Sequence, residues 1–261
     1  MFPLQNKRIL VTRQDNLSSE LIALLVQEKA IPTSIPMIQV RRLHPSIKVE
    51  DILKCNVIVF TSQNAVGFFH DWIGVNHIKL KKHQKIICIG PKTERACRER
   101  NMKVYFTPKA HHASEEMTNH LENIDDLRGE KVLFPKARET RKEFVDSLRL
   151  YFSEVVELEL YETVAREDAR HHFDLLRCEI FDWITFFSPS AVKAFWQMLR
   201  DADESSWIDK PQIKIASIGQ ITSNAIRSLN WKVTVECTRP CSEEMVDFMK
   251  LWERKKNENT L

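Results

Sequence analysis

The chain has 261 residues, of which 43% are hydrophobic and 29% are charged. This composition is typical of a globular protein with a substantial core, and it excludes a disordered chain and a small disulfide-stabilised scaffold. The 39 basic residues are interspersed with 36 acidic ones, so the net charge of +3 does not indicate a nucleic-acid-binding protein.

Glycine is scarce, with 5 residues in the whole chain, and the closest pair is Gly67 and Gly74. A dinucleotide-binding loop or a Walker-type loop needs two or three glycines within about seven residues, because the backbone must approach a phosphate closely. Both kinds of site are therefore excluded.

The cysteines and the N-terminus favour a cytoplasmic protein. None of the 6 cysteines belongs to a Cys-x-x-Cys pair, so we interpret them as reduced thiols. Residues 1–8 contain no apolar segment typical of a secretory signal, and no apolar run approaches the roughly 20 residues of a membrane span. We expect a soluble protein that does not associate with membranes.

Short apolar runs of strand length alternate with segments of helical period. The first run, 9–11, precedes a helix expected over 18–29, for which Ser18 is the candidate N-cap. The strand and helix pairs that follow are 57–60 with 65–72, 86–89 with 93–100, 132–134 with 141–151, 183–187 with 191–199, and 213–218 with 222–229. This alternation predicts an α/β fold with parallel sheets covered on both faces.

The alternation is also a repeat. Residues 57–66 align with 183–192, 85–93 align with 214–222, and both copies continue into an Asn-x-Lys-Val strand that begins at Asn101 or Asn230. Residues 114–117 match 242–245, and residues 7–11 loosely match 130–134. The order and spacing of these matches indicate two copies of one α/β unit.

Two β-rich stretches, 35–41 and 155–164, are predicted to be extended connectors, one in each half of the chain. Periodicity leaves open whether each copy folds alone or exchanges elements with the other through these connectors.

Candidate binding groups lie in the turns that follow the strands. In an open parallel sheet, ligands bind beyond the carboxyl ends of the strands, where helix N-termini present free N–H groups. Serine, threonine and asparagine at these turns would cap helices whatever the function. If the two copies face each other, the turns line a cleft with Arg13, Lys92, Lys136 and Arg138 at its rim, which suits a ligand with several carboxylates or phosphates.

Metal and nucleophile chemistry has less support. The adjacent pairs His111–His112 and His171–His172 lack the spacing of a helical metal site, and Cys237 with Cys241 has no second pair nearby. No Gly-x-Ser-x-Gly segment indicates a hydrolase. Tyr161 lies among glutamates in the second connector, where its phenol is either half-buried in a strand or directed into the space between domains.

The segments together resemble uroporphyrinogen-III synthase over nearly the whole chain. The resemblance rests on the order of Val-Thr-Arg at 11–13, Phe-Thr-Ser at 60–62, Val-Leu-Phe-Pro at 132–135, Leu-Tyr-Glu-Thr at 160–163, Phe-Phe-Ser-Pro-Ser-Ala-Val at 186–192, and Ile-Gly at 89–90 and 218–219. It implies two Rossmann- or flavodoxin-like parallel-sheet domains joined by a two-stranded β-ladder. One domain is discontinuous, 1–36 with 166–261; the other is 43–158, and the linker strands lie at about 37–42 and 159–165.

The family's reaction closes linear hydroxymethylbilane into uroporphyrinogen III, with inversion of ring D and loss of water, without a metal or organic cofactor. Departure of the hydroxyl gives an azafulvene cation, and attack at the substituted D-ring carbon gives a spiro intermediate. The resemblance implies a monomeric cytoplasmic lyase of haem biosynthesis that receives this polycarboxylate from hydroxymethylbilane synthase; contact between the two enzymes is a hypothesis.

The resemblance also implies site residues. Tyr161 would assist departure of the hydroxyl, and Lys214 matches a basic residue near the site in some members. The residues implied around the tetrapyrrole are Thr61, Ser62, Thr93, Ser188, Ser190 and Thr222. The strand-to-helix turns add Arg13, Gln63, Gly90, Lys136, Pro189 and Gly219 as candidates.

The chain departs from the family in its last turn. Members commonly have Gly-Pro-Thr-Thr where this chain has Gly-Gln-Ile-Thr at 219–222, and Gln14 replaces a frequent proline. The altered turn leaves a non-catalytic, tetrapyrrole-binding regulatory relative as the alternative. A nucleotide-sugar transferase is a third hypothesis, which the shortage of glycine disfavours.

Overall fold

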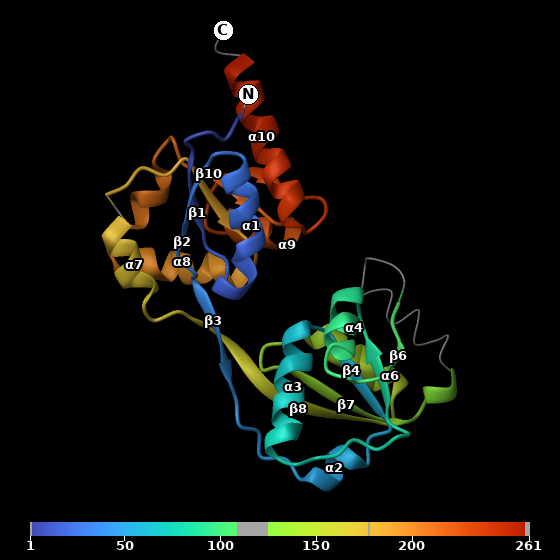
Figure 1. The fold of residues 1–261 in the computed structure, drawn as a ribbon. Helices are drawn as coiled ribbons and strands as arrows, with labels where there is room; N and C mark the ends of the chain where they lie inside the picture. Colours follow the sequence, from blue (N-terminus) through green and yellow to red (C-terminus); the bar gives the residue numbers. More distant parts are fainter. Residues whose placement is uncertain (1, 109–124, 177, 259–261) are drawn as a thin grey trace. The chain divides into compact units, whose positions relative to one another are not determined.

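The chain folds around two separate, largely parallel sheets, shown with their covering helices in Figure 1. The computed structural model describes residues 2–108, 125–176 and 178–258. Contacts divide the chain into unit 1, Met1–Gln39 with Val164–Leu261, and unit 2, Val40–Thr163. The sequence match at 114–117 and the pair His111–His112 lie outside the described residues.

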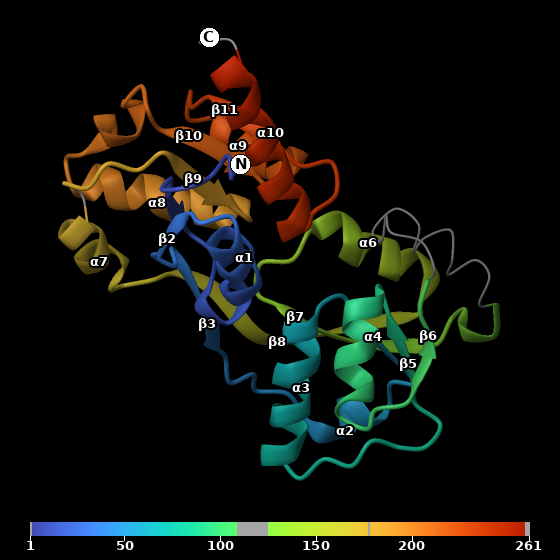
Figure 2. The same cartoon turned by 45° about the horizontal axis from the view of Figure 1, so that its top comes forward.

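Unit 1 contains a five-stranded sheet in the order β11-β10-β9-β1-β2, with parallel pairing throughout the described strands. The strands are β1 (Arg8–Val11), β2 (Ile31–Ser34), β9 (Trp183–Phe186), β10 (Lys214–Ser217) and β11 (Val233–Glu236). Helices α1 (Asp15–Gln27) and α10 (Ser242–Glu258) lie side by side on one face, as Figure 2 shows. The other face is covered by α7 (Ala169–Leu176), α8 (Pro189–Asp201), α9 (Gln220–Arg227) and the short helix η2 (Ser205–Asp209).

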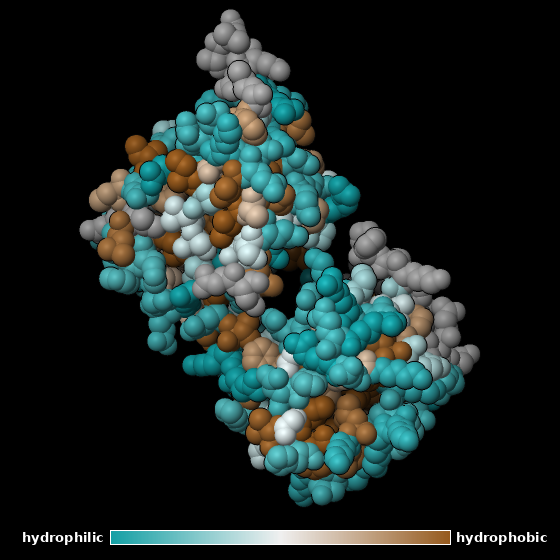
Figure 3. Space-filling model, viewed as in Figure 1, coloured by the Kyte–Doolittle hydropathy of each residue, from teal (hydrophilic) through white to brown (hydrophobic). Residues whose placement is uncertain are grey.

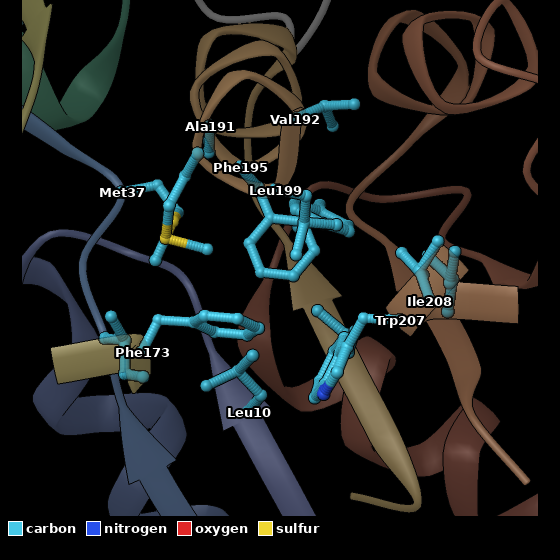
Figure 4. Close-up of a cluster of buried hydrophobic side chains, with 14 of the residues drawn as sticks. Leu10, Met37, Phe173, Ala191, Val192, Phe195, Leu199, Trp207 and Ile208 are labelled. Atoms are coloured by element: carbon cyan, nitrogen blue, oxygen red, sulfur yellow. The ribbon is translucent and has the colours of Figure 1, made fainter. Parts of the chain in front are cut away.

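The strands of unit 1 are apolar because both faces of the sheet are buried. Successive side chains of a strand point to opposite faces, so Leu10 packs toward α7 and α8 while Ile9 and Val11 pack toward α1 and α10. Figure 4 shows Leu10 beside Phe173 and Trp207, whose ring centroids are 5.0 Å apart in an edge-to-face contact. Burial of each such side chain stabilises the fold by roughly 1.5–3 kcal/mol.

Unit 2 contains a six-stranded sheet in the order β3-β8-β7-β4-β5-β6. The strands are β3 (Ile38–Arg42), β4 (Val57–Phe60), β5 (Lys85–Cys88), β6 (Val104–Phe106), β7 (Lys131–Ala137) and β8 (Glu154–Ala165). Helices α2 (Val49–Leu53), α3 (Gln63–Val75) and α4 (Pro91–Arg98) pack on one face. The other face is covered by α6 (Lys142–Tyr151) and the short helix η1 (Asp125–Leu127).

The chain passes between the units through β3 and β8. The Leu43 N–H donates to the Leu160 C=O at 2.8 Å and the Arg166 N–H donates to the Met37 C=O at 3.0 Å. From the first bond to the second, the residue number falls from 43 to 37 in one segment and rises from 160 to 166 in the other. The two segments therefore run in opposite directions and form a two-stranded ladder.

The strand orders support the duplication inferred from the sequence. Paired by their sequence matches, β9, β10, β11 and β1 of unit 1 occupy the same sheet positions as β4, β5, β6 and β7 of unit 2. The last pair in this arrangement, β2 and β8, lies beside β1 and β7. In the chain, β1 and β2 precede the other strands of their sheet, β9, β10 and β11, whereas β7 and β8 follow β4, β5 and β6. Unit 1 is therefore built from both ends of the chain.

Some element boundaries differ from the predictions. Gln14, not Ser18, is the N-cap of α1, because Ser18 shares the buried face of the helix with Leu21 and Leu25. The strands expected to begin at Asn101 and Asn230 begin later, at Val104 and Val233. Both asparagines have positive φ angles, 56° and 60°, and turn the chain after the preceding helix.

The remaining features concern the surface, the helices and the thiols. Hydrophilic residues cover most of the visible face in Figure 3, and apolar residues lie between them in groups. Among the described residues, no helix is long and apolar enough to cross a membrane. All 6 cysteines are free in the structure, and burial raises the pKa of Cys55 to about 11 and that of Cys237 to about 12.

Candidate functional site

Each sheet has one point at which the strand order reverses direction. In unit 1 this point lies between β1 and β9, and in unit 2 it lies between β4 and β7. Open α/β sheets bind ligands in the crevice outside the carboxyl ends of the strands at such a point. The residues that follow these strands are therefore the first candidates: Arg13 and Ser188 in unit 1, and Thr61, Ser62 and Arg138 in unit 2.

Two predicted site serines cap equivalent helices. The Ser62 hydroxyl accepts from the Ala65 N–H at 3.0 Å at the start of α3, and the Ser188 hydroxyl accepts from the Ala191 N–H at 3.1 Å at the start of α8. The other first-turn N–H groups have no partner within their helix and, with the helix dipole, favour an anion. Pro189 has no N–H at the first position of α8, so α3 offers more donors.

The phenol of Tyr161 is held by two contacts in unit 2. Its hydroxyl oxygen lies 2.9 Å from the Ser62 hydroxyl oxygen, and its ring stacks on Phe68 with centroids 4.9 Å apart and an interplanar angle of 16°. Burial raises the pKa of Tyr161, and the hydrogen bond with Ser62 opposes this only in part. The phenol therefore stays protonated at neutral pH and can donate a proton.

A shift of strand register explains why Tyr161 is buried. The pairing of β7 with β8 shifts between Lys136 and Ala137, so that Ala137 lies opposite Tyr161. Such a shift breaks the alternation of side chains along the strand. Leu160 and Tyr161, although consecutive, both belong to the core beneath α3, with exposures of 1% and 7%.

Glu162, which follows Tyr161 in the sequence, pairs with two arginines in the structure. The Glu162 carboxylate accepts from Arg41 Nε at 2.8 Å and from Arg138 Nη1 at 2.6 Å. The bond from Arg41, followed by the charge of Arg138, holds the pKa of Glu162 below its usual range. Sequence reasoning missed Arg41; its place in one predicted connector, with glutamates in the other, was the available signal.

Lys136 is predicted to lie in a turn, but the structure places it in a strand. β7 continues to Ala137, so Lys136 belongs to the strand, and its ammonium nitrogen lies 2.7 Å from a Glu157 carboxylate oxygen and 3.7 Å from one of Glu159. The side chain is 7% exposed. Its charge is compensated within the sheet, and the predicted turn position of Lys136 is therefore wrong.

Arg13 is the cation beside the reversal point of unit 1. Its guanidinium lies 4.3 Å from the centroid of the Phe187 ring, and Nη1 donates to the Ser242 hydroxyl at 3.3 Å. That hydroxyl donates in turn to Glu20 at 3.0 Å. Burial lowers the pKa of Arg13, and the charge of Glu20 opposes this. Among the described residues no carboxylate forms a direct ion pair with Arg13, so it retains the capacity to bind an anion.

The two predicted Gly turns begin α4 and α9. Gly90 and Gly219 are the N-cap residues, with φ angles of −162° and 156°. Thr93 and Thr222 lie in the first turns with only 5% and 3% exposure, so their side chains face the core. These turns present backbone groups rather than threonine hydroxyls.

Lys214 lies at the opposite edge of its sheet. It begins β10, whereas Gly219 follows the end of that strand. Its ammonium lies 3.2 Å from a Glu253 carboxylate oxygen and over the rings of Trp183 and Trp252, at 5.4 and 4.9 Å. Burial lowers the pKa of Lys214, with Glu253 opposing. This buried pair holds α10 on the sheet, and it separates Lys214 from the turn residues at the other end of β10.

The remaining candidates are at least partly exposed to solvent. Thr61 and Pro189 are partly buried, whereas Gln63 and Ser190 are exposed in the first turns of α3 and α8. Within residues 2–108, 125–176 and 178–258, no three His, Cys, Asp or Glu side chains converge to hold a metal ion.

A family model described as uroporphyrinogen-III synthase HemD matches residues 19–247. The chain is 25% identical over 236 residues to the uroporphyrinogen-III synthase of Chlorobaculum parvum, a match that covers 88% of this chain and 92% of the relative.

Two solved structures share the fold. Uroporphyrinogen III synthase from the extremely thermophilic bacterium Thermus thermophilus has a TM-score of 0.61 at 13% identity, covering 97% of this chain and 99% of that one. The enzyme from Helicobacter pylori has a TM-score of 0.63 at 15% identity, covering 92% and 97%. Because the family model matches most of the sequence, the chain belongs to the uroporphyrinogen-III synthase family, enzymes of tetrapyrrole biosynthesis.

Proposed function

We propose that the chain converts hydroxymethylbilane into uroporphyrinogen III with inversion of ring D and release of water, and thus acts as a cyclising hydro-lyase. Family membership supports the reaction. The observation that carries the proposal to a site is the protonated phenol of Tyr161, held by Ser62 beside the N-terminus of α3.

In this proposal Tyr161 is the proton donor. As the terminal carbon–oxygen bond of the substrate breaks, the departing hydroxyl takes the phenolic proton and leaves as water, which gives the azafulvene cation. The ring carbon that closes the macrocycle finally loses one proton, and the phenolate takes it up. Proton and charge therefore balance over one turnover, and no cofactor is required.

The other proposed groups bind the carboxylates of the substrate. The first-turn amides of α3 and the charge of Arg13 suit carboxylates. The proposed binding residues are Arg13, Thr61, Ser62, Gln63, Gly90, Thr93, Ser188, Pro189, Ser190, Gly219 and Thr222, with the buried threonines contributing through their backbone.

The altered last turn does not favour the non-catalytic alternative. Gly219 still begins α9, and the side chain of Thr222 is buried, so substitution of the neighbouring Pro and Thr of the family leaves the backbone groups in place. The family model and the similar relatives favour the synthase.

A product analysis tests the function. Hydroxymethylbilane cyclises unaided to the uninverted isomer I, so the enzyme's contribution is orientation of the reacting ends. The substrate is made in situ by hydroxymethylbilane synthase, and the products are oxidised and resolved chromatographically into isomers I and III. We expect isomer III to predominate. The same mixture of isomers as with heat-denatured protein, with no excess of isomer III, would overturn the proposal.

We further propose that the protein acts as a monomer in the cytoplasm and takes its substrate from hydroxymethylbilane synthase through transient contact. Sedimentation of the two proteins, alone and mixed during turnover, tests this. A species larger than a monomer in the sample of this protein alone would overturn the monomer. A mixture that contains only the species seen with each protein alone, with no chemical crosslink between them, would overturn the contact and leave free diffusion as the route.

A further inference from the structure

Helix α3 contributes more to the surroundings of Tyr161 than its capping serine. Phe68, in the second turn of the helix, stacks its ring on that of Tyr161. Arg42 places its guanidinium 5.1 Å from the centroid of the Phe68 ring and pairs with Asp71 of the same helix at 2.6 Å. The hydrogen bond and the ring stacking of the phenol thus both come from α3 and its N-cap.

The two direct contacts restrain different parts of the phenol. The bond with Ser62 fixes the position of the hydroxyl oxygen but leaves the ring free to rotate about its long axis. The near-parallel Phe68 ring fixes the plane of the Tyr161 ring. Together the contacts restrict the phenol to one orientation before a substrate binds, which is the condition for efficient proton transfer.

We propose that Phe68 is a positioning residue for the reaction, which holds the Tyr161 phenol against Ser62 and shields it from water. This inference rests on the proposed role of Tyr161 as the proton donor. Phe68 itself touches no reacting atom and acts through Tyr161.

The proposal predicts a measurable effect on the phenol itself. Burial and the Ser62 bond are the two causes that act on the pKa of Tyr161. The charged groups nearby are paired with each other: Arg41 and Arg138 with Glu162, and Arg42 with Asp71. Loss of the Phe68 ring admits water to one face of the phenol and should therefore lower the pKa of Tyr161 toward its ordinary value.

The sequence makes this effect easy to observe. The chain has 3 tyrosines, so substitution of Tyr105 and Tyr151 by Phe leaves Tyr161 as the single source of phenolate absorbance. Phe68→Leu and, as a second variant of similar volume, Phe68→Met are compared in this background. Phe69→Leu is the matched control, because Phe69 is adjacent, fully buried and in ring contact with Phe60 instead.

Kinetics are measured on the same variants without the tyrosine substitutions. We expect Phe68→Leu and Phe68→Met to lower the pKa of Tyr161 and to reduce kcat for isomer III by about five- to tenfold, with KM changed less than about twofold. Phe68→Tyr, which retains the ring, should restore kcat. Phe69→Leu should lower the melting temperature without changing the Tyr161 titration.

Each result decides the proposal. An unchanged pKa and kcat in a folded Phe68 variant would overturn it, and so would an equal loss of kcat in Phe69→Leu. If the wild type makes no isomer III, the proposed function fails. The titration still reports separately whether Phe68 holds the phenol: a lowered pKa supports the contact, and an unchanged one refutes it.

Discussion

The hydroxyl oxygens of Tyr161 and Ser62 lie 2.9 Å apart although the residues are 99 positions apart in the sequence. The bond joins β8 to the turn after β4, with β7 between the two strands in the sheet. Ser62 also accepts the Ala65 N–H, so its own proton remains free for a further bond. One serine therefore both begins α3 and orients the phenol.

Tyr161→Phe should reduce turnover without loss of the fold. The variant keeps the ring that stacks on Phe68 and removes only the hydroxyl. A positioned proton donor accelerates a reaction by about a hundredfold or more, and water can replace it in part, so we expect isomer III to form at least about tenfold more slowly. The measurement is the rate of isomer III formation with circular dichroism as the control. An unchanged rate would remove the phenol from the mechanism.

Ser62→Ala and Ser188→Ala separate helix capping from the bond with the phenol. Each substitution removes an N-cap bond and should cost about 1 kcal/mol of unfolding free energy. Of the two serines, only Ser62 also bonds the Tyr161 hydroxyl among the described contacts, and this bond favours the phenolate. Ser62→Ala should therefore raise the pKa of Tyr161 further, while Ser188→Ala leaves it unchanged. Equal pKa values in both variants would contradict the assignment.

The features of the fold that were predictable depend on local pattern. β4 was expected at 57–60 and lies at Val57–Phe60, because a strand buried on both faces is continuously apolar. β2 was missed, since Pro32 weakens the strand signal and is tolerated at the edge position that β2 occupies. The strands predicted to begin at Asn101 and Asn230 begin later, because both asparagines adopt the left-handed conformation of a turn. The amino-acid type alone does not distinguish this conformation from the start of a strand.

The candidate site was less predictable because its contacts are distant in sequence. Ser62 was visible as a turn residue after a strand, yet its bond to Tyr161 depends on strand order and on the register shift of β7 and β8. Phe68 belongs to an apolar helix with no feature that marks its partner. Lys214 was assigned through resemblance, and only the tertiary structure shows that its partner, Glu253, lies on α10.

Lys214→Met should destabilise the protein rather than slow it. The substitution keeps the aliphatic stem and leaves the Glu253 carboxylate, which is 3% exposed, without its closest cation. Breaking a buried ion pair costs about 3–5 kcal/mol. We expect a value near the lower limit, because Trp183 still donates to Glu253 at 2.8 Å and Lys7 lies 3.9 Å away.

Urea unfolding and the rate of isomer III formation measure these two effects of Lys214→Met separately. At a temperature where the variant is folded, turnover per folded molecule should equal that of the wild type. A fall in turnover with unchanged stability would return Lys214 to the substrate site.

Glu244 should contribute to acid sensitivity. Its carboxylate accepts the N–H groups of Arg239 and Thr238 at 2.6 and 2.7 Å, and these bonds lower its pKa below the ordinary 4.5. The folded state then binds fewer protons than the unfolded state, so the stabilisation is present above pH 4.5 and is lost as the pH falls through the folded-state value.

Glu244→Gln should be less stable than the wild type at pH 7 but lose less stability on acidification. Glu243→Gln, at an exposed position, should behave like the wild type. Urea midpoints across this range test both, and parallel curves for wild type and Glu244→Gln would refute the linkage.

Gly219→Ala and Gly90→Ala should differ although the glycines occupy equivalent turns. Gly219 has φ 156° and ψ 178°, a region that is essentially restricted to glycine, so alanine there should cost about 1–3 kcal/mol. Gly90 has φ −162° and ψ 164°, which any residue adopts, and an added Cβ would meet no atom within 4 Å. Gly90→Ala should therefore be neutral or stabilise by up to about 1 kcal/mol through the unfolded chain. Thermal unfolding of both variants decides this, because equal losses of stability would show that the two turns carry the same backbone requirement.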